Sequence, residues 1–281
     1  MKWIYSLLIG ILKIIRDKKT KSKFLHIVFW IKIKFLSVIQ AKKSGSVKFL
    51  NFTVNFITIE SLAYLFEEIF IFHIYHFETN KDKPVIIDAG SNIGMATLYF
   101  KFYRPNSNVM CFEADPTTFL YLKKNIEENK LENVQVHNVA LWSEETSLNF
   151  KKSSNLISHV QQGKSEQADL SKIQQESTEH YFAVQANILS PYIKGPIDFL
   201  KIDIEGAESN VFAELETSDK LKFIDQMTIE CHLQNGLVTN LKNLLRIISD
   251  EHYFIQVGTY QLLNRNFLVN QDCMIYVKKK S

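Results

Sequence analysis

The stretch VIIDAGSNIG, residues 85–94, places a carboxylate beside a glycine turn. Asp88 ends an apolar, β-branched run, and Gly90, Asn92 and Gly94 follow at alternate positions. A glycine turn after a strand lets a ligand approach the backbone closely. A dinucleotide site would hold pyrophosphate on three glycines spaced G-x-G-x-x-G, and Asp88 would repel that group. The pattern therefore favours a ligand that carries a cation, such as the ammonium group of an amino acid.

A second acid completes this pattern. Glu113 lies at the end of the next apolar run, 25 residues after Asp88, where nucleotide-binding sheets place an acid that accepts ribose hydroxyls. An amino-acid half and a nucleoside half together describe S-adenosylmethionine. The plainer interpretation is that Gly90 and Gly94 only permit a tight turn and that Glu113 is a solvated strand end.

Three further side chains are candidates for catalysis. Asp203 and Glu205 follow the apolar run IDFLKI, and His232 follows QMTIEC. Methyl transfer from a sulfonium is an in-line displacement, so the protein has to position the acceptor and accept its proton. Carboxylates and an imidazole can do both. We expect Asp203 to lie nearest the methyl group, and Glu208 to brace the loop.

Each catalytic candidate also has a structural interpretation. The charge of Glu205 could simply favour the start of the next helix, and His232 could be a satisfied strand-end histidine. Asp203, Glu205 and His232 together could hold a divalent metal. Their spacing does not single out a metal site, so no metal is predicted.

The elements that position these residues alternate between strands and helices. Apolar runs at 84–90, 108–114 and 134–141 alternate with helical patterns, the first from Met95 to near Pro105 and the second over 115–129. The alternation continues with an apolar run at 197–203, a helix from about 207, an apolar run at 224–232 and a helix over 241–248. The last two predicted strands are centred on YFIQV and CMIYV. The alternation predicts a doubly wound α/β sheet, whose strand ends would bring the candidate residues to one edge.

Two segments fall outside this alternation. Residues 151–179 are rich in Ser, Gln and Lys and are predicted to form a mobile insert or lid. Residues 1–45 are predicted to be a basic amphipathic extension, and residues 46–281 the main domain. The three cysteines show no metal-ligand or disulfide spacing, which favours a reducing compartment.

The N-terminal extension carries most of the positive charge. Residues 1–43 hold eleven Lys or Arg and one acid, whereas the whole chain has a net charge of +3. The rest of the chain is therefore acidic, which argues against nucleic acid as a partner. The apolar runs at 3–12 and 24–31 are too short to cross a bilayer, and no cleavage box follows them. We expect either peripheral contact with anionic lipid through residues 1–43 or a helix pair packed on the main domain.

Several stretches resemble the FkbM-type methyltransferases. VIIDAGSNIGMATLYF, CFEADP, VALW, DFLKIDIEGAE and IECH occur in the order and approximate spacing of that family. The resemblance covers roughly residues 50–278, and KIDIEGAE is its most specific part. It implies a Rossmann-like class I sheet of seven strands with a reversed last strand, and S-adenosylmethionine as cofactor. The implied cofactor contacts are the methionine half on Asp88, Gly90, Asn92 and Gly94, the ribose on Glu113 and the adenine edge on Ala140.

The resemblance implies an O-methyltransferase that acts on a hydroxyl of a sugar or glycan. We expect it in the cytoplasm, with the inner face of the membrane as a further site of contact, and the sequence leaves the oligomeric state open. One alternative is a non-catalytic, membrane-associated protein that binds S-adenosylmethionine. An NAD-dependent oxidoreductase is disfavoured by the missing third glycine and by Asp88.

Overall fold

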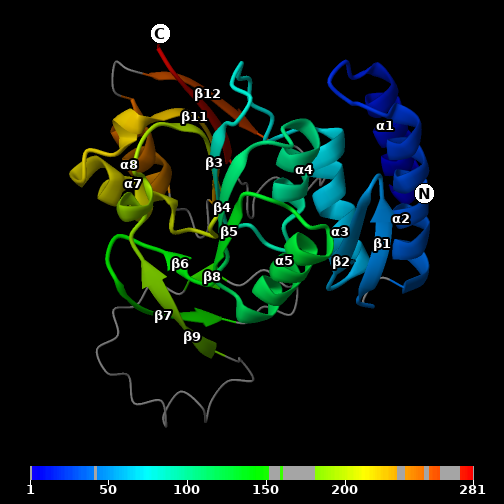
Figure 1. Cartoon of the computed structure of the whole chain (residues 1–281), viewed down its shortest axis with the longest axis horizontal. Coiled ribbons are helices and arrows are strands. Elements are labelled where there is room, and N and C mark those ends of the chain that lie inside the picture. The colour runs from blue at the N-terminus through cyan, green and yellow to red at the C-terminus, as the bar shows by residue number, and fades with distance from the viewer. Residues whose placement is uncertain are drawn as a thin grey trace. The chain divides into compact units, whose positions relative to one another are not determined.

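The computed structural model describes residues 2–40, 43–151, 159–160, 181–232, 238–249, 253–259 and 273–280 (Figure 1). These residues form two compact units. The first unit consists of residues 1–84, 91–111 and 116–136, and the second of residues 85–90, 112–115 and 137–281.

Helices dominate the first part of the chain. It contains α1 (Lys2–Arg16), α2 (Lys23–Gln40), β1 (Gly45–Phe49), β2 (Phe52–Phe56), α3 (Ile59–Phe66), the π-helix η1 (Glu67–Ile71), β3 (Val85–Ala89), α4 (Met95–Tyr103), β4 (Asn108–Phe112), α5 (Pro116–Glu128) and β5 (Val134–His137). Pro116 occupies the first position of α5, where proline is favoured because its missing N–H has no helical partner in any case.

Strands dominate the remainder. It contains β6 (Ala140–Leu141), β7 (Thr146–Lys151), β8 (His159–Val160), β9 (Tyr181–Asn187), η2 (Ser190–Tyr192), β10 (Ile197–Ile202), α7 (Glu208–Thr217), η3 (Leu221–Phe223), β11 (Ile224–Cys231), α8 (Val238–Ile248), β12 (Tyr253–Thr259) and β13 (Cys273–Lys279). The helices predicted from about 207 and over 241–248 are confirmed as α7 and α8.

The main sheet has seven strands in the order β12-β13-β11-β10-β3-β4-β5. Strand β10 is parallel to β3 and to β11. Strand β13 lies between β11 and β12 and is antiparallel to both. The predicted doubly wound sheet with a reversed last strand is therefore confirmed.

Strand β10 is buried at every position, including Asp198 and Lys201. A strand covered on both faces is expected to be an unbroken apolar run, and β10 departs from that rule only at these two residues. The Asp198 carboxylate accepts a hydrogen bond from the Val85 amide at 2.8 Å. Lys201 lies opposite Asp88 in the register between β10 and β3. Asp198 therefore contacts the start of β3, and Lys201 lies beside its end.

The prediction of a single strand over 134–141 is wrong. The segment is divided into β5, in the seven-stranded sheet, and β6, in a second sheet of order β6-β9-β7-β8. The break comes at Asn138, whose side-chain amide donates to the Glu113 carbonyl at 2.9 Å. Such side-chain hydrogen bonds compete with the strand ladder. The insert predicted over 151–179 lies outside the described residues except for Lys151 and β8.

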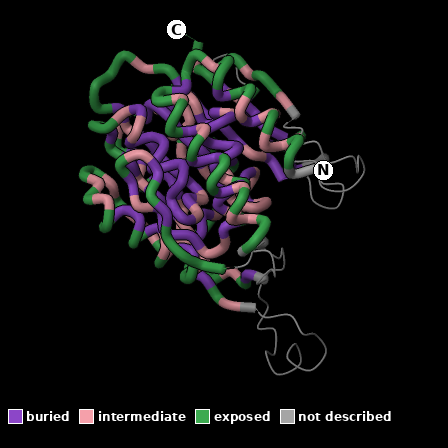
Figure 2. Tube along the Cα trace, turned by 90° about the vertical axis from the view of Figure 1, so that its right-hand side faces the viewer, coloured by how far each residue is buried: buried purple, intermediate pink, exposed green. Residues whose placement is uncertain are grey.

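The N-terminal helices contact the rest of the first unit through aromatic side chains. Phe29 and Trp30 are buried and lie against Phe66. The outer surface of these helices is exposed, as the side of the molecule shown in Figure 2 illustrates. The extension is thus helical, as predicted, whereas the boundary at residue 45 stays a prediction.

Candidate active site

The strand ends of the second unit converge around Gly90. Its amide donates to the carbonyl of Phe112, the last residue of β4, at 2.9 Å, and the Asp203 amide donates to the Ala89 carbonyl at 3.1 Å. The ends of β4 and β10 therefore flank the end of β3. This is the point where the strand order reverses, which is where open α/β sheets bind ligands.

Two glycines of the turn after β3 are required by the protein itself. Gly90 has a φ of +77°, and a Cβ atom there would overlap the carbonyl oxygen of Asp203. Gly94 has a φ of +89°, and a Cβ atom there would lie 2.9 Å from Cδ1 of Leu122. Both positions strongly favour glycine. The fold alone therefore accounts for both glycines, and their predicted contact with the cofactor stays a prediction.

Asn92 also adopts a positive φ, of 51°. Asparagine tolerates this conformation better than most residues, and its Oδ1 accepts a hydrogen bond from the Ile93 amide at 2.7 Å. Asn92 and Gly94 belong to the first unit, whereas Asp88, Gly90, Glu113 and the catalytic candidates belong to the second. Their predicted contact with the cofactor stays a prediction.

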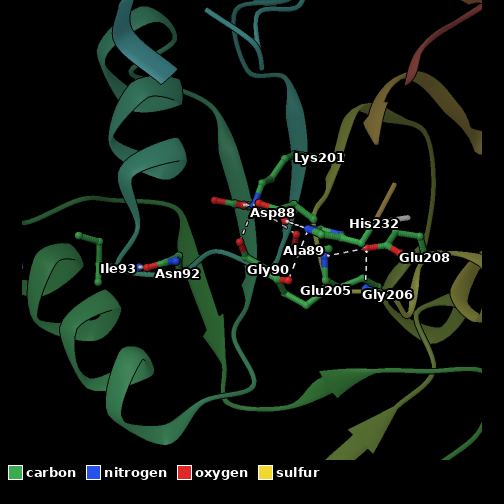
Figure 3. A network of polar contacts seen from close by, with 12 residues as sticks. Asp88, Ala89, Gly90, Asn92, Ile93, Lys201, Glu205, Gly206, Glu208 and His232 are labelled. Atoms are coloured by element: carbon green, nitrogen blue, oxygen red, sulfur yellow. Dashed lines mark hydrogen bonds and ion pairs between the residues drawn. The ribbon is translucent and has the colours of Figure 1, made fainter. Parts of the chain in front are cut away.

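The carboxylate of Asp88 is fully buried and faces the ammonium group of Lys201 at 3.4 Å (Figure 3). Lys201 also donates to the carbonyl oxygen of Gly90. Burial by itself disfavours its charged form, but the charges of Asp203 and Asp88 raise the pKa of Lys201 above its ordinary value. Asp88 thus already has an ammonium partner within the protein, which the sequence argument overlooked.

The sequence held a signal for Lys201. A lysine inside the otherwise apolar run IDFLKI is unusual, because an unpaired ammonium group is costly to bury. Asp198, the other charged residue of this run, lies three positions earlier, so the alternation of a strand puts the two side chains on opposite faces. A charged residue in such a run therefore predicts a buried partner of opposite charge.

The three catalytic candidates lie together. Nε2 of His232 is 3.7 Å from Oδ1 of Asp203 and 3.5 Å from Oε2 of Glu205. The other oxygen of Asp203, Oδ2, is 3.5 Å from Nζ of Lys201. Asp203 and Glu205 are each 25% exposed in their side chains, whereas His232 is 7% exposed. The two carboxylates can therefore meet a ligand, while His232 lies against both of them and Lys201 against Asp203.

Glu208 braces this cluster, as the sequence predicts. Its Oε1 accepts hydrogen bonds from the amides of Ile204 at 3.3 Å and Gly206 at 3.1 Å. The same oxygen lies 2.9 Å from Nδ1 of His232 (Figure 3). Glu208 is itself buried at the first position of α7. A single carboxylate thus fixes both the loop and the ring of His232.

The protonation of His232 follows from these neighbours. Burial alone would lower its pKa, but the hydrogen bond to Glu208 and the charges of Glu208, Glu205 and Asp203 raise the pKa of His232 well above 6.5. These neighbours therefore favour the imidazolium form of the ring. It donates to carboxylates and is poorly suited to take a proton first.

The loop between β10 and α7 is strained at Glu205. This residue has a φ of 57° and the following Gly206 a φ of 103°. A residue with a side chain rarely adopts such a conformation, and the cost is of order 1–3 kcal/mol. Here the strain directs the Glu205 carboxylate toward His232. Such strain persists where the surroundings over-determine it, and it clusters at functional sites.

The cluster is also compatible with a cation. Ligand atoms of Asp203, Glu205 and His232 lie within 4.8 Å of one another. Hard oxygen ligands and one imidazole can bind a divalent metal, but the imidazole would first have to lose its proton. The sequence prediction of a metal-free site stays a prediction.

The two remaining cofactor candidates have different surroundings. Glu113 is half-buried, and its Oε1 accepts a hydrogen bond from the Asp115 amide at 2.8 Å. Its amide donates to the His137 carbonyl at 3.0 Å. Ala140 is buried in β6 and packs in a cluster with Phe150, Val184 and Ala186. The contacts of Ala140 are those of ordinary packing, and its predicted place at the adenine edge stays a prediction.

The chain is similar to known methyltransferases. Residues 88–255 match the methyltransferase FkbM domain family. Methyltransferase 1 of Beauveria bassiana is 31% identical over 199 residues, which cover 66% of this chain and 79% of that protein. The 2-O-methyltransferase NoeI of Sinorhizobium fredii is 28% identical over 157 residues, which cover 51% of this chain and 63% of that protein.

Among solved structures, the methyltransferase FkbM of Methylobacillus flagellatus has a TM-score of 0.47 at 13% identity, over 78% of this chain and 54% of that one. The family match covers more than half of the chain and includes both Asp88 and the Asp203–His232 cluster. The chain therefore belongs to the FkbM methyltransferase family, whose members take their methyl group from S-adenosylmethionine.

Proposed function

We propose that this methyltransferase acts on a hydroxyl oxygen, and that the hydroxyl belongs to a sugar or glycan. The observation that carries the proposal is the pair of partly exposed carboxylates, Asp203 and Glu205, which both lie against His232. An alcohol is a poor nucleophile until its proton is being removed. A site built around two carboxylates suits that task.

The residues of the second unit fit the cofactor. Glu113 is a half-exposed carboxylate at the end of β4, suited to accept the two ribose hydroxyls. The acids at the end of β10 suit a ligand that carries positive charge. When bound, the cofactor supplies an electrophilic methyl group on a sulfonium. The residues of the second unit proposed to hold it are Asp88, Gly90, Glu113 and Ala140.

Asp203 is proposed to receive the acceptor hydroxyl. Its carboxylate is the charged group directly after β10, beside the end of β3. It would accept a hydrogen bond from the hydroxyl and so orient the oxygen lone pair toward the methyl carbon. When the methyl group is transferred, the Asp203 carboxylate would take up the hydroxyl proton and release it to solvent.

Glu205 and His232 would support this step. The His232 imidazolium lies between the two carboxylates, so it keeps them at a fixed separation. Glu205 is proposed to hold a neighbouring hydroxyl of the acceptor or to share the released proton. A sugar offers adjacent hydroxyls, and two carboxylates side by side suit such a pair.

The substrate class rests on chemistry and on one relative. The name 2-O-methyltransferase states that NoeI transfers methyl to an oxygen. Two acidic side chains are frequent partners for hydroxyl groups because a carboxylate accepts strong hydrogen bonds. The name of the relative supports an oxygen acceptor, and the two carboxylates support an acceptor with several hydroxyl groups.

A transfer assay with tritium-labelled methyl donor tests the proposal. The purified full chain would be incubated with free sugars, lipid-linked glycan extracts, phenols and carboxylic acids. We expect label in the sugar fraction that survives mild base, because methyl ethers are stable there and methyl esters are not. Label that is lost in mild base, or that appears only on non-sugar acceptors, would contradict the proposal.

The alternative of a non-catalytic binding protein gives a different result. In that case the chain would bind S-adenosylmethionine in calorimetry yet transfer label to no acceptor of the panel. The Asp203→Asn variant serves as the matched control, since it should bind the cofactor and show little transfer.

A further inference from the structure

Exposed apolar side chains gather on the two N-terminal helices. Of the sixteen large hydrophobic residues that are exposed in the described part of the chain, twelve lie on α1 or α2. Scattered exposed hydrophobic residues are normal, whereas a contiguous patch marks an interaction surface. The twelve are Ile4, Tyr5, Leu8, Leu12, Ile15, Phe24, Leu25, Val28, Ile31, Phe35, Val38 and Ile39.

Their spacing places them on one face of each helix. On α1 the exposed residues Ile4, Leu8 and Leu12 recur at every fourth position. On α2 the series runs from Phe24 to Val38 at intervals of three or four residues. This is the period of a helical stripe. The opposite side of α2 carries Phe29, Trp30 and Ile33, which are buried. Each helix is therefore apolar both inward and outward.

The two helices form a fixed pair. The indole nitrogen of Trp30 donates to the Leu7 carbonyl at 3.2 Å, and a Cβ atom at Gly10 would overlap the Trp30 ring. Lys34 on α2 forms an ion pair with Glu67 at 3.3 Å. Figure 1 shows α1 and α2 side by side. The outward stripes are thus held on the first unit and do not depend on a partner to form.

Exposed cations surround these stripes. Arg16, Lys18, Lys19 and Lys21 are exposed at the end of α1 and in the loop to α2, and Lys32 is exposed on α2. The acid of this loop, Asp17, faces inward, with Oδ2 3.8 Å from Nε2 of His73. The apolar stripes are therefore bordered by positive charge.

We infer that the outward face of α1 and α2, defined by the twelve residues above, is a docking surface for an anionic lipid bilayer. A helix that carries apolar residues on one side and Lys or Arg beside them lies in the plane of a membrane interface. Anionic lipid attracts each nearby cation. Within the described residues no helix is long and apolar enough to span a membrane, so the contact is peripheral.

Charge favours lipid over a second copy of the chain. Apposing this face with its own copy would bring the two sets of Lys and Arg together, and like charges repel. An anionic headgroup layer neutralises them while the acyl region covers the apolar stripes. Docking of this kind would bring the catalytic chain to acceptors at a membrane, although the docking itself does not depend on the methyl acceptor.

Flotation of the full-length chain with vesicles tests the inference. Vesicles of phosphatidylcholine alone would be compared with vesicles that also contain phosphatidylglycerol, at physiological salt. We expect the chain to float with the anionic vesicles. A variant with Leu12→Ser and Phe35→Ser should bind at least about tenfold more weakly, because it removes exposed apolar area from the stripes. Both side chains are exposed, at 50% and 60%, so the core is unchanged.

Two further variants make the result specific. Leu120→Ser with Phe254→Ser removes apolar residues that are each 65% exposed elsewhere, and it should float like the wild type. Lys18→Gln, Lys19→Gln and Lys32→Gln together should weaken binding to anionic vesicles by about a hundredfold, at roughly 1 kcal/mol per lysine. Urea unfolding would confirm that each variant is folded.

Three outcomes would overturn the inference. The wild type would remain unbound with anionic vesicles, or the Leu12→Ser, Phe35→Ser variant would float as well as the wild type. In the third outcome, sedimentation without lipid would show a dimer that this variant abolishes while wild-type flotation is absent. That result would assign the face to a second copy of the chain.

Discussion

Each oxygen of the Asp203 carboxylate faces a cation. Nζ of Lys201 lies 3.5 Å from one oxygen and Nε2 of His232 lies 3.7 Å from the other. Two cations fix the plane of the carboxylate, so an acceptor hydroxyl would meet a pre-oriented group. Pre-orientation of this kind reduces the entropic cost of reaching the reactive geometry.

Replacing Asp203 by Asn should separate binding from catalysis. We expect turnover to fall by about 10² to 10⁴, the usual contribution of a positioned proton acceptor. The dissociation constant of S-adenosylmethionine, measured by calorimetry, should stay nearly constant. Asp225→Asn is the control, because this exposed residue of β11 lies away from the cluster. Normal turnover of the D203N variant would show that Asp203 has no catalytic role.

Asp88 offers a test of its two interpretations. In Asp88→Asn the ammonium group of Lys201 loses one of the carboxylates that pair with it, and breaking a buried ion pair costs about 3–5 kcal/mol. We expect a lower free energy of unfolding and, as a second effect, weaker binding of S-adenosylmethionine to the folded protein. If only stability falls, Asp88 serves the fold through Lys201, and its predicted contact with the ammonium group of the cofactor is refuted.

Glu113 is expected to act directly on the cofactor. Glu113→Ala should weaken S-adenosylmethionine binding by about 1.5–3 kcal/mol for each charge-assisted hydrogen bond lost. Glu113→Gln keeps an oxygen for the Asp115 amide, so it separates the loss of charge from the loss of the local turn. Glu132→Ala, at an exposed site, is the matched control. If Glu113→Ala, Glu113→Gln and Glu132→Ala all bind S-adenosylmethionine with equal affinity, Glu113 does not bind the ribose.

At the scale of elements, β3 is held by its neighbours on both sides. The amide of Gly90 donates a hydrogen bond to the end of β4. Because Gly90 has no side chain, the backbone after β10 can approach it closely. The turn therefore sets how closely the strand ends approach. A sequence motif with two glycines is enough to predict a turn, but it does not say which atom would collide with a side chain.

Gly90→Ala should destabilise the protein far more than Gly195→Ala. The first substitution adds a Cβ atom that overlaps the Asp203 carbonyl at a φ of +77°, whereas at Gly195 nothing lies within 4 Å. We expect G90A to unfold at much lower urea concentration or to be insoluble, and G195A to change stability by about 1 kcal/mol or less. Equal midpoints would show that β10 can move away from β3 at little cost.

The assignment of β6 to the second sheet could not be predicted from the sequence pattern. Residues 134–141 read as one apolar run, yet β6 pairs with β9, through Ala140 and Ala186. A strand of two residues has too short a pattern to assign to a sheet. The choice between sheets depends on Asn138 and on a partner strand more than forty residues away, neither of which has a local signal.

On the scale of the whole chain, buried histidines make the first unit sensitive to acid. The ring of His73 lies 2.9 Å from Thr20 Oγ1 and 3.1 Å from the Tyr99 hydroxyl, and it is buried. Burial lowers the pKa of His73 from 6.5 to about 4, and the charge of Asp17 offsets only part of this effect. The network joins the N-terminal segment to α4 within the first unit.

This network predicts a loss of stability between pH 6.5 and about pH 4. In that window the unfolded chain protonates His73 while the folded chain does not, so unfolding takes up a proton and stability falls as the pH falls. The slope for one group is at most about 1.4 kcal/mol per pH unit. Urea unfolding across this range should show a shallower loss for His73→Gln than for the wild type. An identical slope would mean that His73 does not couple folding to pH.

The sequence by itself determined the family, most of the alternation of strands and helices from residue 84 onward, and the acids near the ends of β3, β4 and β10. The alternation follows from local periodicity, the family from motifs in a given order and spacing, and the reversed last strand was implied by the resemblance to that family. Only the tertiary structure decided that Asp88 pairs with Lys201, that His232 is held as an imidazolium by Glu208, and that the N-terminal helices expose an apolar face. Each of these depends on which side chains meet across distant segments, because burial and charge pairing are properties of the packed chain.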